Sequence, residues 1–410
     1  MAGLAEPVRT ALIGAGNRAT EQYQPLFKSM QPWMTVVAVC DPVKEHADSL
    51  AQQLGVPAFY SIHDLVRAKP MEAALIVTPI PSHHSISCYL SQHGIHNQVE
   101  TTITSLLSQA QEMVATAKKN NVILRVAENF FRFPIDRIAQ KVDETGFIGK
   151  VGRVTCMYDH TGYHNNSRWV RFFRGYPESV QAIRHSMPVA PYYEAPHRYH
   201  TTEPFRCHFY TFPGDRLVVD LAGNIKSRLG RYPRPGYTEF AGERGAIVQE
   251  SSAHGAARAE VRFCSEEALK TGGWADQIFP VVHVNKEGCW ISTYVDLPGG
   301  RVEYVNPHRP IERAHHQQDY YGPTIMGHMV DFARAIRKDG PSEYTDQDAV
   351  MAMMMEVGTR ESELQDGARI KLPLVGRLES EERVREAQKA EYGVDPLDIE
   401  GMLAISYPRP

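Results

Sequence analysis

The sequence lacks the features that mark secreted, membrane-spanning or disulfide-stabilised proteins. Its six cysteines are scattered over 410 residues and form no C-x-x-C pair, so reduced thiols in a cytoplasmic protein are expected. No apolar run approaches the roughly 20 residues that a membrane span needs. The N-terminal residues show no basic segment followed by an apolar one, so no signal peptide is expected either.

Charge of either sign is not in excess. The formal net charge is −4 and the isoelectric point about 6.5, so nothing in the charge balance suggests a surface for nucleic acid. Hydrophobic residues make up 42% of the chain, as in ordinary globular proteins. At this length a single core is improbable, and two domains are expected.

The first third of the chain alternates apolar runs of strand length with amphipathic stretches of helix length. Such a repeated β-α-β pattern predicts an α/β Rossmann domain with a doubly wound parallel sheet, over residues 1–130. The expected strands are residues 8–13, 36–40, 74–77 and 122–126, and the expected helices are 22–29, 44–54, 83–92 and 105–119.

From about residue 151 the strand-like segments are no longer separated by helices. This change predicts a C-terminal α+β domain with a large open, mostly antiparallel sheet, over residues 131–375. The charged tail, residues 376–410, is expected to wrap the surface or a partner subunit of a dimer or tetramer. The expected strands are 151–158, 205–212, 217–221, 237–241, 246–250 and 259–263, and helices are expected at 322–337 and 346–366.

A glycine-rich turn lies between the first expected strand and the first helix. It reads Gly14-Ala15-Gly16-Asn17-Arg18-Ala19, and it fits G-x-G-x-x-G/A, in which the first glycine makes the turn and the second admits a pyrophosphate. Asp41 follows the next strand, where a carboxylate accepts hydrogen bonds from ribose hydroxyls and repels a 2′-phosphate. NAD is therefore favoured, while Arg18 and Lys44 keep NADP open.

Seven segments, in their order and spacing, resemble the Gfo/Idh/MocA family of sugar and inositol oxidoreductases. They are residues 11–19, 39–42, 77–84, 100–102, 128–134, 358–362 and 370–373. The resemblance implies an NAD-dependent enzyme that transfers hydride at a ring carbon of a sugar or glycoside. It implies cofactor-binding roles for Gly14, Gly16, Asn17, Arg18, Asp41, Thr78, Pro79, His84, Glu100 and Asn129.

Two departures from the family pattern point to its NAD-dependent glycoside hydrolase branch. Thr101 follows Glu100, where the family usually has a catalytic lysine. The family's Gly-Gly-x-x-x-Asp-x-x-x-His stretch is absent, and residues 182–189, with His185 and Pro188, resemble instead a His-x-x-x-Pro segment of the glycoside hydrolases, with the proline one place earlier. Tyr158 and His160 likewise resemble their Tyr-x-His stretch.

These residue types suit a redox-neutral reaction of oxidation, elimination, water addition and reduction, because histidine and a tuned tyrosine move protons near neutral pH. Tyr158, His160 and His185 are the catalytic candidates, although Tyr158 could equally be a packed strand residue. The basic and aromatic run at 168–174 is expected to be a loop near the cleft or a packing segment. Substrate contacts are predicted for Arg132, Tyr163, His164, Arg168 and Trp169.

Other functions remain open. A net sugar or inositol dehydrogenase would need another residue in the role of the lysine, and a non-catalytic NAD-bound sensor would need none. The histidine pairs at 197/200 and 315/316 lack further ligands at suitable spacing, so no metal site is predicted.

Overall fold

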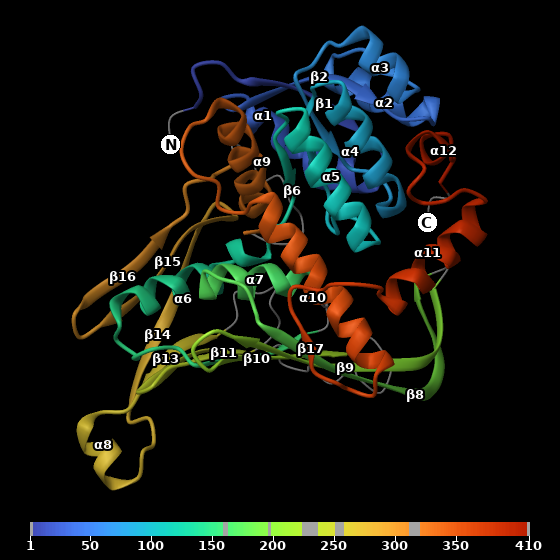
Figure 1. Cartoon of the computed structure of the whole chain (residues 1–410). Helices are drawn as coiled ribbons and strands as arrows, with labels where there is room; N and C mark the ends of the chain where they lie inside the picture. The colour runs from blue at the N-terminus through green and yellow to red at the C-terminus, as the bar shows by residue number, and fades with distance from the viewer. Residues whose placement is uncertain are drawn as a thin grey trace. The chain divides into compact units, whose positions relative to one another are not determined.

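The computed structural model describes residues 3–158, 163–195, 198–223, 237–250, 258–310 and 320–407. It divides into two compact units. Figure 1 shows the chain coloured by residue number from the N-terminus to the C-terminus. Unit 1 comprises Met1–Asn129, Pro307–Met353 and Arg377–Arg409, and unit 2 comprises Phe130–Asn306 and Met354–Gly376. No helix in the described ranges is both long and apolar enough to cross a bilayer.

Unit 1 contains the predicted parallel sheet. Its six strands are ordered β3-β2-β1-β4-β5-β6, and every neighbouring pair is parallel, which confirms the Rossmann prediction. The strands are β1 (Val8–Ile13), β2 (Met34–Cys40), β3 (Ala58–Phe59), β4 (Ala73–Ile76), β5 (His96–Val99) and β6 (Leu124–Val126).

Helical segments connect the strands of this sheet. The first connection is irregular, with η1 (Ala19–Tyr23), η2 (Gln24–Leu26) and α1 (Phe27–Met30), and Pro25 in it lacks the N–H that a regular helix would use. The others are α2 (Lys44–Leu54), α3 (Ile62–Ala68), η3 (Ile80–Ser82), α4 (His83–Gln92) and α5 (Leu107–Lys119).

Residues 307–310 and 320–353 pack with unit 1, whereas the sequence assigned them to the sheet domain. The cause is α9 (Tyr321–Arg337), whose apolar side chains, among them Ile325, Met329 and Phe332, share one core with Leu12 and Leu75 of the parallel sheet. The predicted domain bounds 131–375 are therefore wrong for this segment.

The tail folds onto unit 1 as α11 (Glu379–Tyr392) and α12 (Ile399–Leu403). The carboxylate of Glu381 accepts hydrogen bonds from the backbone N–H and the hydroxyl of Ser108 at 2.7 and 2.5 Å. The Gln109 amide donates to the Pro396 carbonyl at 2.8 Å. The tail thus covers the surface of its own chain at the N-terminus of α5.

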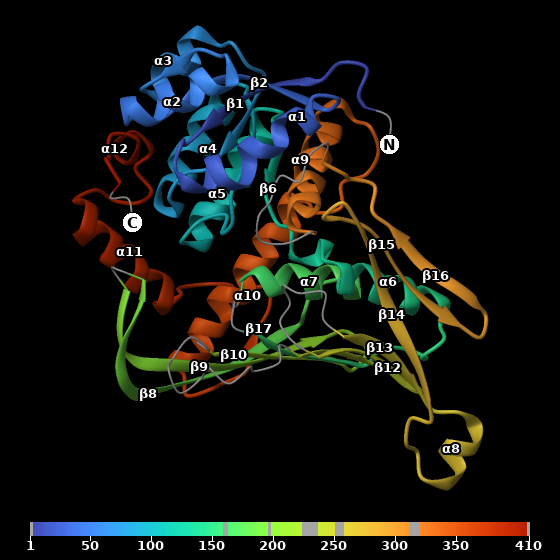
Figure 2. The ribbon, with the colours of Figure 1, turned by 180° about the vertical axis from the view of Figure 1, so that it is seen from behind.

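Unit 2 is built on an eleven-stranded sheet, in the order β16-β15-β14-β13-β12-β11-β7-β10-β9-β8-β17. Among these strands only β7 and β10 pair in parallel, so the prediction of a large, mostly antiparallel sheet is confirmed (Figure 2). The strands are β7 (Arg153–Tyr158), β8 (Ser179–Ala195), β9 (Arg198–Phe212), β10 (Arg216–Gly223), β11 (Tyr237–Ala241), β12 (Gly245–Glu250), β13 (Ala259–Phe263), β14 (Gln277–Lys286), β15 (Cys289–Leu297), β16 (Gly300–Val305) and β17 (Ile370–Lys371).

The run at 168–174 lies in a helix for most of its length, not in the predicted loop. Trp169, Phe172 and Phe173 are buried in α7 (Tyr163–Phe173), at the i, i+3 and i+4 spacing that places them on one face. The other helical segments that contribute to unit 2 are η4 (Phe130–Arg132), α6 (Pro134–Thr145), α8 (Glu266–Thr271) and the C-terminal part of α10 (Asp346–Leu364).

Candidate functional site

The residues predicted to bind the cofactor gather at one edge of the parallel sheet in unit 1. Gly14 follows β1, Asp41 follows β2, and Thr78, Glu100 and Asn129 come after the carboxyl ends of β4, β5 and β6. The strand order reverses between β1 and β4. In doubly wound sheets, dinucleotides bind at the carboxyl edge beside such a reversal, so the unit has the geometry of a dinucleotide site.

The glycine-rich turn is shaped by contacts that exclude side chains. Gly14 has a φ of +96° and donates its N–H to the carbonyl of Cys40 at 2.8 Å. A Cβ at this position would clash with the carbonyl oxygen of Val77. Only glycine combines this backbone conformation with so close an approach.

Asp41 fixes the same turn from the neighbouring strand. Its carboxylate accepts hydrogen bonds from the backbone N–H groups of Ala15 and Val43, each at 2.8 Å, and the residue is only 2% exposed. Each carboxylate oxygen has a second lone pair. Asp41 can therefore hold the turn and still accept a ribose hydroxyl, as predicted for NAD.

Glu100 is a buried anion at the end of β5. It accepts hydrogen bonds from Arg18 Nε at 2.6 Å, from the Tyr23 hydroxyl at 2.7 Å and from the Thr101 N–H at 2.9 Å. Burial alone would raise the pKa of the Glu100 carboxyl, but the charge and hydrogen bond of Arg18 outweigh burial and lower the pKa to about 2. Glu100 therefore stays ionised and ties the helix start after the glycine-rich turn to β5.

His83 links two of the cofactor loops, a role that the sequence analysis missed by choosing His84. Its Nδ1 and Nε2 atoms lie 2.9 Å from the carbonyl oxygens of Thr102 and Thr78. Burial lowers the pKa of His83 despite these carbonyls. The ring of His84 faces Glu112 instead, at 3.0 Å. The sequence does indicate His83 in one respect, because it lies five residues after Thr78, with only the turn η3 between them.

The nicotinamide side of the site has a polar atom suited to a ligand. The buried hydroxyl of Thr102 has no hydrogen-bond partner among the described residues, although its own carbonyl faces His83. Asn129, which follows the end of β6, is also buried, and its amide donates to the Thr324 hydroxyl at 3.2 Å. With the turn and Asp41, these groups fit a nicotinamide dinucleotide.

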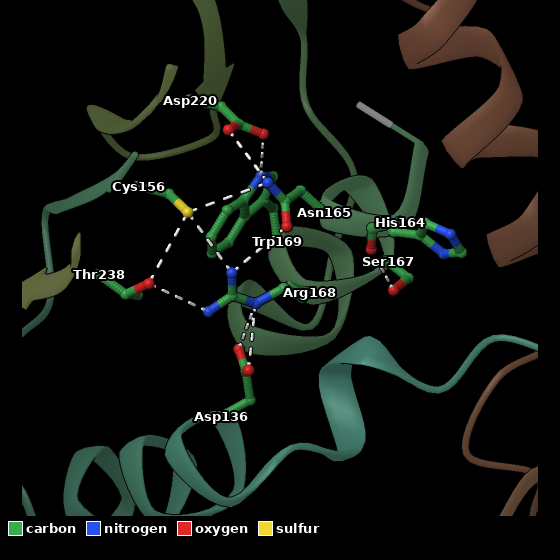
Figure 3. Close-up of polar contacts among 9 residues, drawn as sticks. All are labelled: Asp136, Cys156, His164, Asn165, Ser167, Arg168, Trp169, Asp220 and Thr238. Carbon is green, nitrogen blue, oxygen red and sulfur yellow. Dashed lines mark hydrogen bonds and ion pairs between the residues drawn. The ribbon is translucent and has the colours of Figure 1, made fainter. Parts of the chain in front are cut away.

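The residues of α7 form a second polar cluster, which lies inside unit 2 (Figure 3). The Arg168 guanidinium is buried and donates from Nε to both carboxylate oxygens of Asp136, at 2.9 and 3.1 Å. Its other nitrogens reach Cys156 Sγ at 3.5 Å, Asn165 at 3.3 Å and Thr238 at 3.4 Å. Arg168 thus anchors α7 to α6, β7 and β11.

Asp220, on β10, is the second carboxylate of this cluster. It accepts hydrogen bonds from Asn165 Nδ2 at 3.1 Å and from the Trp169 indole at 3.4 Å. Both donors are neutral, and burial raises the pKa of the Asp220 carboxyl to about 6. Arg168 and Trp169 are 1% and 0% exposed, so their described contacts position the helix, and substrate contact by them stays a prediction.

The predicted substrate residues Tyr163 and His164 open α7. The His164 ring stacks on Phe130, with ring centroids 4.2 Å apart and an angle of 10° between the planes, and it lies 4.2 Å from the Tyr163 ring. Arg132, on η4, is buried, with its guanidinium 4.6 Å from the Phe131 centroid. The structure therefore brings Tyr163 and His164 together next to η4.

Of the three catalytic candidates, the structure describes His185 and the backbone of Tyr158. Tyr158 ends β7, where its backbone pairs with Ala222, and His160 lies outside the described residues. His185 is exposed on β8 and pairs with Phe205. Because side chains alternate along a strand, His185 shares the face of exposed Ile183, opposite to buried Ala182. No group of three potential metal ligands occurs among the described residues.

Comparison with known proteins agrees with the dinucleotide site that the residues at the strand ends indicate. Residues 8–128 match the model of the Gfo/Idh/MocA oxidoreductase family with an NAD-binding Rossmann fold. Residues 8–128 thus match the NAD-binding Rossmann domain of that family.

Curated relatives match over part of their length. The chain is 26% identical over 144 residues to scyllo-inositol 2-dehydrogenase (NAD(+)) of Bacillus subtilis, which covers 35% of the chain and 42% of that protein. It is 28% identical over 196 residues to glycosyl hydrolase family 109 protein 1 of Phocaeicola vulgatus, which covers 42% and 40%. The chain thus spans less than half the length of these relatives.

Solved structures share the fold over nearly the whole chain. A levoglucosan dehydrogenase in complex with NADH and levoglucosan superposes with a TM-score of 0.66 at 18% identity, covering 90% of this chain and 100% of that one. An oxidoreductase from Agrobacterium radiobacter in complex with NAD+, L-tartaric acid and magnesium gives a TM-score of 0.68 at 15% identity, covering 89% and 98%.

Proposed function

We propose that the chain is an NAD-dependent enzyme that acts on a sugar or glycoside by hydride transfer at a ring carbon, and that it cleaves the glycosidic bond without net redox change. One observation carries the redox-neutral part. Beside the buried anion Glu100, where the resembled dehydrogenases keep a lysine, stands Thr101, whose hydroxyl lies 3.3 Å from Glu100 Oε2. A threonine carries no charge with which to tune a proton acceptor.

The chain's own residues supply binding and proton transfer. The turn at Gly14 and Gly16, with the start of η1, would hold the pyrophosphate, and Asp41 would accept the ribose hydroxyls. Bound NAD supplies a hydride acceptor that returns the hydride at the end of the cycle. Tyr158, His160 and His185 are proposed as catalytic residues that move protons of the substrate.

Relatives support a carbohydrate as substrate. Their names include a 2,7-anhydro-N-acetylneuraminate hydratase, two glycosyl hydrolase family 109 proteins and an inositol dehydrogenase. A homo-oligomeric, cytoplasmic enzyme is part of the same proposal, and light scattering behind a sizing column tests the oligomer. The names of the relatives and solved structures include both a glycosyl hydrolase family and a levoglucosan dehydrogenase.

The experiment is to incubate the purified protein with chromogenic glycosides, with and without added NAD, and to follow both the released chromophore and NADH absorbance. We expect release of chromophore without accumulation of NADH, and loss of activity in Gly16→Val, which blocks the pyrophosphate. Stoichiometric NADH from a free sugar would support the net dehydrogenase instead. Retained NAD without turnover of any sugar or glycoside would support a sensor.

A further inference from the structure

We propose that Tyr321, held by the Arg18 guanidinium, exchanges the hydroxyl proton of the substrate at the nicotinamide half of unit 1. The inference rests on the proposed function. It assigns the transfer of the substrate hydroxyl proton to Tyr321, a residue outside the sequence motifs. It also explains how the site works with Thr101 in place of a lysine, because a cation and a hydroxyl are supplied from two other segments.

The geometry of this pair is set by three segments of unit 1. Arg18, at the start of η1, donates from Nε to Glu100 at 2.6 Å and from Nη1 to the Tyr321 hydroxyl at 3.0 Å. Tyr321 is the first residue of α9. The Arg18 guanidinium also lies 5.9 Å from the Tyr321 ring centroid. One guanidinium therefore bridges the buried anion and the phenol oxygen.

The position of Glu100 places this pair in the nicotinamide half. A doubly wound sheet binds one mononucleotide over each half, and the glycine-rich turn with Asp41 defines the half of β1 and β2. Glu100 follows β5, on the other side of the strand-order reversal. The Arg18 side chain is 37% exposed, and Tyr321 is partly buried against the core of unit 1, so neither member of the pair is sealed from a bound molecule.

The electrostatics suit proton exchange at the phenol oxygen. Arginine stays charged at any working pH, and the anion of Glu100 holds its guanidinium in place. A fixed positive charge that donates to an oxygen stabilises negative charge on that oxygen. In the oxidation half, bound NAD⁺ would take the C–H hydride. The substrate O–H proton would pass to the Tyr321 oxygen, which would release its own proton to solvent, leaving a C=O group. The reduction half reverses both transfers.

The first test needs no substrate. The full-length protein, stripped of nucleotide with charcoal, is treated with N-acetylimidazole, and acetylation of each tyrosine is followed by mass spectrometry. We expect Tyr321 to react at least tenfold faster in the wild type than in Arg18→Gln, and saturating NAD⁺ to slow it at least tenfold. Tyr89, on the outer part of α4, is the internal control that neither change affects. Equal rates of Tyr321 acetylation in all three samples would overturn the proposal.

The second test measures catalysis. Tyr321→Phe should lower kcat by about a hundredfold, the usual effect of losing an acid/base group, with KM and the NAD⁺ affinity unchanged. The control Tyr89→Phe should match the wild type. Full turnover by Tyr321→Phe would overturn this inference and leave the proposed function standing. A wild type without turnover of any sugar or glycoside would refute the proposed function, whereas the acetylation rates still decide the role of Tyr321.

Discussion

Replacing Asp220 by asparagine should change how the stability of unit 2 depends on pH. The Asp220 side chain is fully buried, and its two hydrogen bonds come from the neutral groups of Asn165 and Trp169. Burial raises the pKa of the carboxyl from 3.8 to about 6. Each unit by which burial raises a pKa costs the folded state about 1.4 kcal/mol once the group ionises, so ionised Asp220 costs about 3 kcal/mol.

The folded state binds the Asp220 proton more tightly than the unfolded state does. Protonation of Asp220 therefore favours folding at low pH, and this contribution to the free energy of unfolding is lost as the pH rises through 6. An asparagine cannot ionise, and it can accept from only one of the two donors, which costs about 1 kcal/mol at every pH. Between pH 4 and pH 7, the free energy of unfolding of the wild type should therefore fall by about 2.4 kcal/mol relative to Asp220→Asn, because the unfolded-state carboxyl is already partly ionised at pH 4.

Urea unfolding from pH 4 to pH 7.5, followed by tryptophan fluorescence, measures this difference, because Trp169 lies in the network. Asp215→Asn is the matched control, since Asp215 is an exposed aspartate in the turn before β10. Unfolding free energies of wild type and Asp220→Asn that change in parallel with pH would refute the reasoning.

Three further substitutions test the cofactor site and the α7 anchor. Gly14→Ala should abolish NAD binding in calorimetry and lower the melting temperature, because its Cβ would meet the Val77 carbonyl; unchanged affinity would contradict the turn assignment. NAD should bind at least tenfold tighter than NADP, and Asp41→Ala should narrow that ratio, whereas equal wild-type affinities would refute the role of Asp41. Arg168→Met should destabilise unit 2 by about 3–5 kcal/mol in denaturant unfolding, because it leaves the buried Asp136 unpaired; the double variant Arg168→Met/Asp136→Leu should recover much of this loss, and no recovery would argue against the ion pair as the cause.

The sequence predicted the fold well where apolar periodicity was strong. β1, α2 and α4 have the predicted bounds. β5 was missed because its sequence, His96-Asn97-Gln98-Val99, is mostly polar: Asn97 bonds to Ser87 at 2.6 Å, and Gln98 bonds to the carbonyl of His328 at 3.0 Å. These partners lie on α4 and α9, outside the strand itself, so the pattern of the strand does not indicate them.

Residues of the candidate site that directly follow a strand could be predicted from the sequence. Residues whose role depends on tertiary partners could not. Gly14 and Asp41 stand directly after strands, so their place was readable from the sequence. The Arg18–Glu100–Tyr321 contacts join positions up to 303 residues apart. Arg168 was taken for a loop residue because its partner Asp136 lies on another helix, and a basic, aromatic run looks alike on a surface loop and in a buried helix.

The claim that the enzyme cleaves a glycoside without net redox change is tested most directly by following the transferred hydride. The substrate glycoside is prepared with deuterium at the ring carbon that gives up hydride, and the protein turns it over in unlabelled water with NADH absorbance followed throughout. Redox-neutral cleavage predicts a primary isotope effect, return of that deuterium to the same carbon of the product, and no accumulation of NADH. Product with a ketone at that carbon and one NADH per turnover would contradict it and establish a net dehydrogenase.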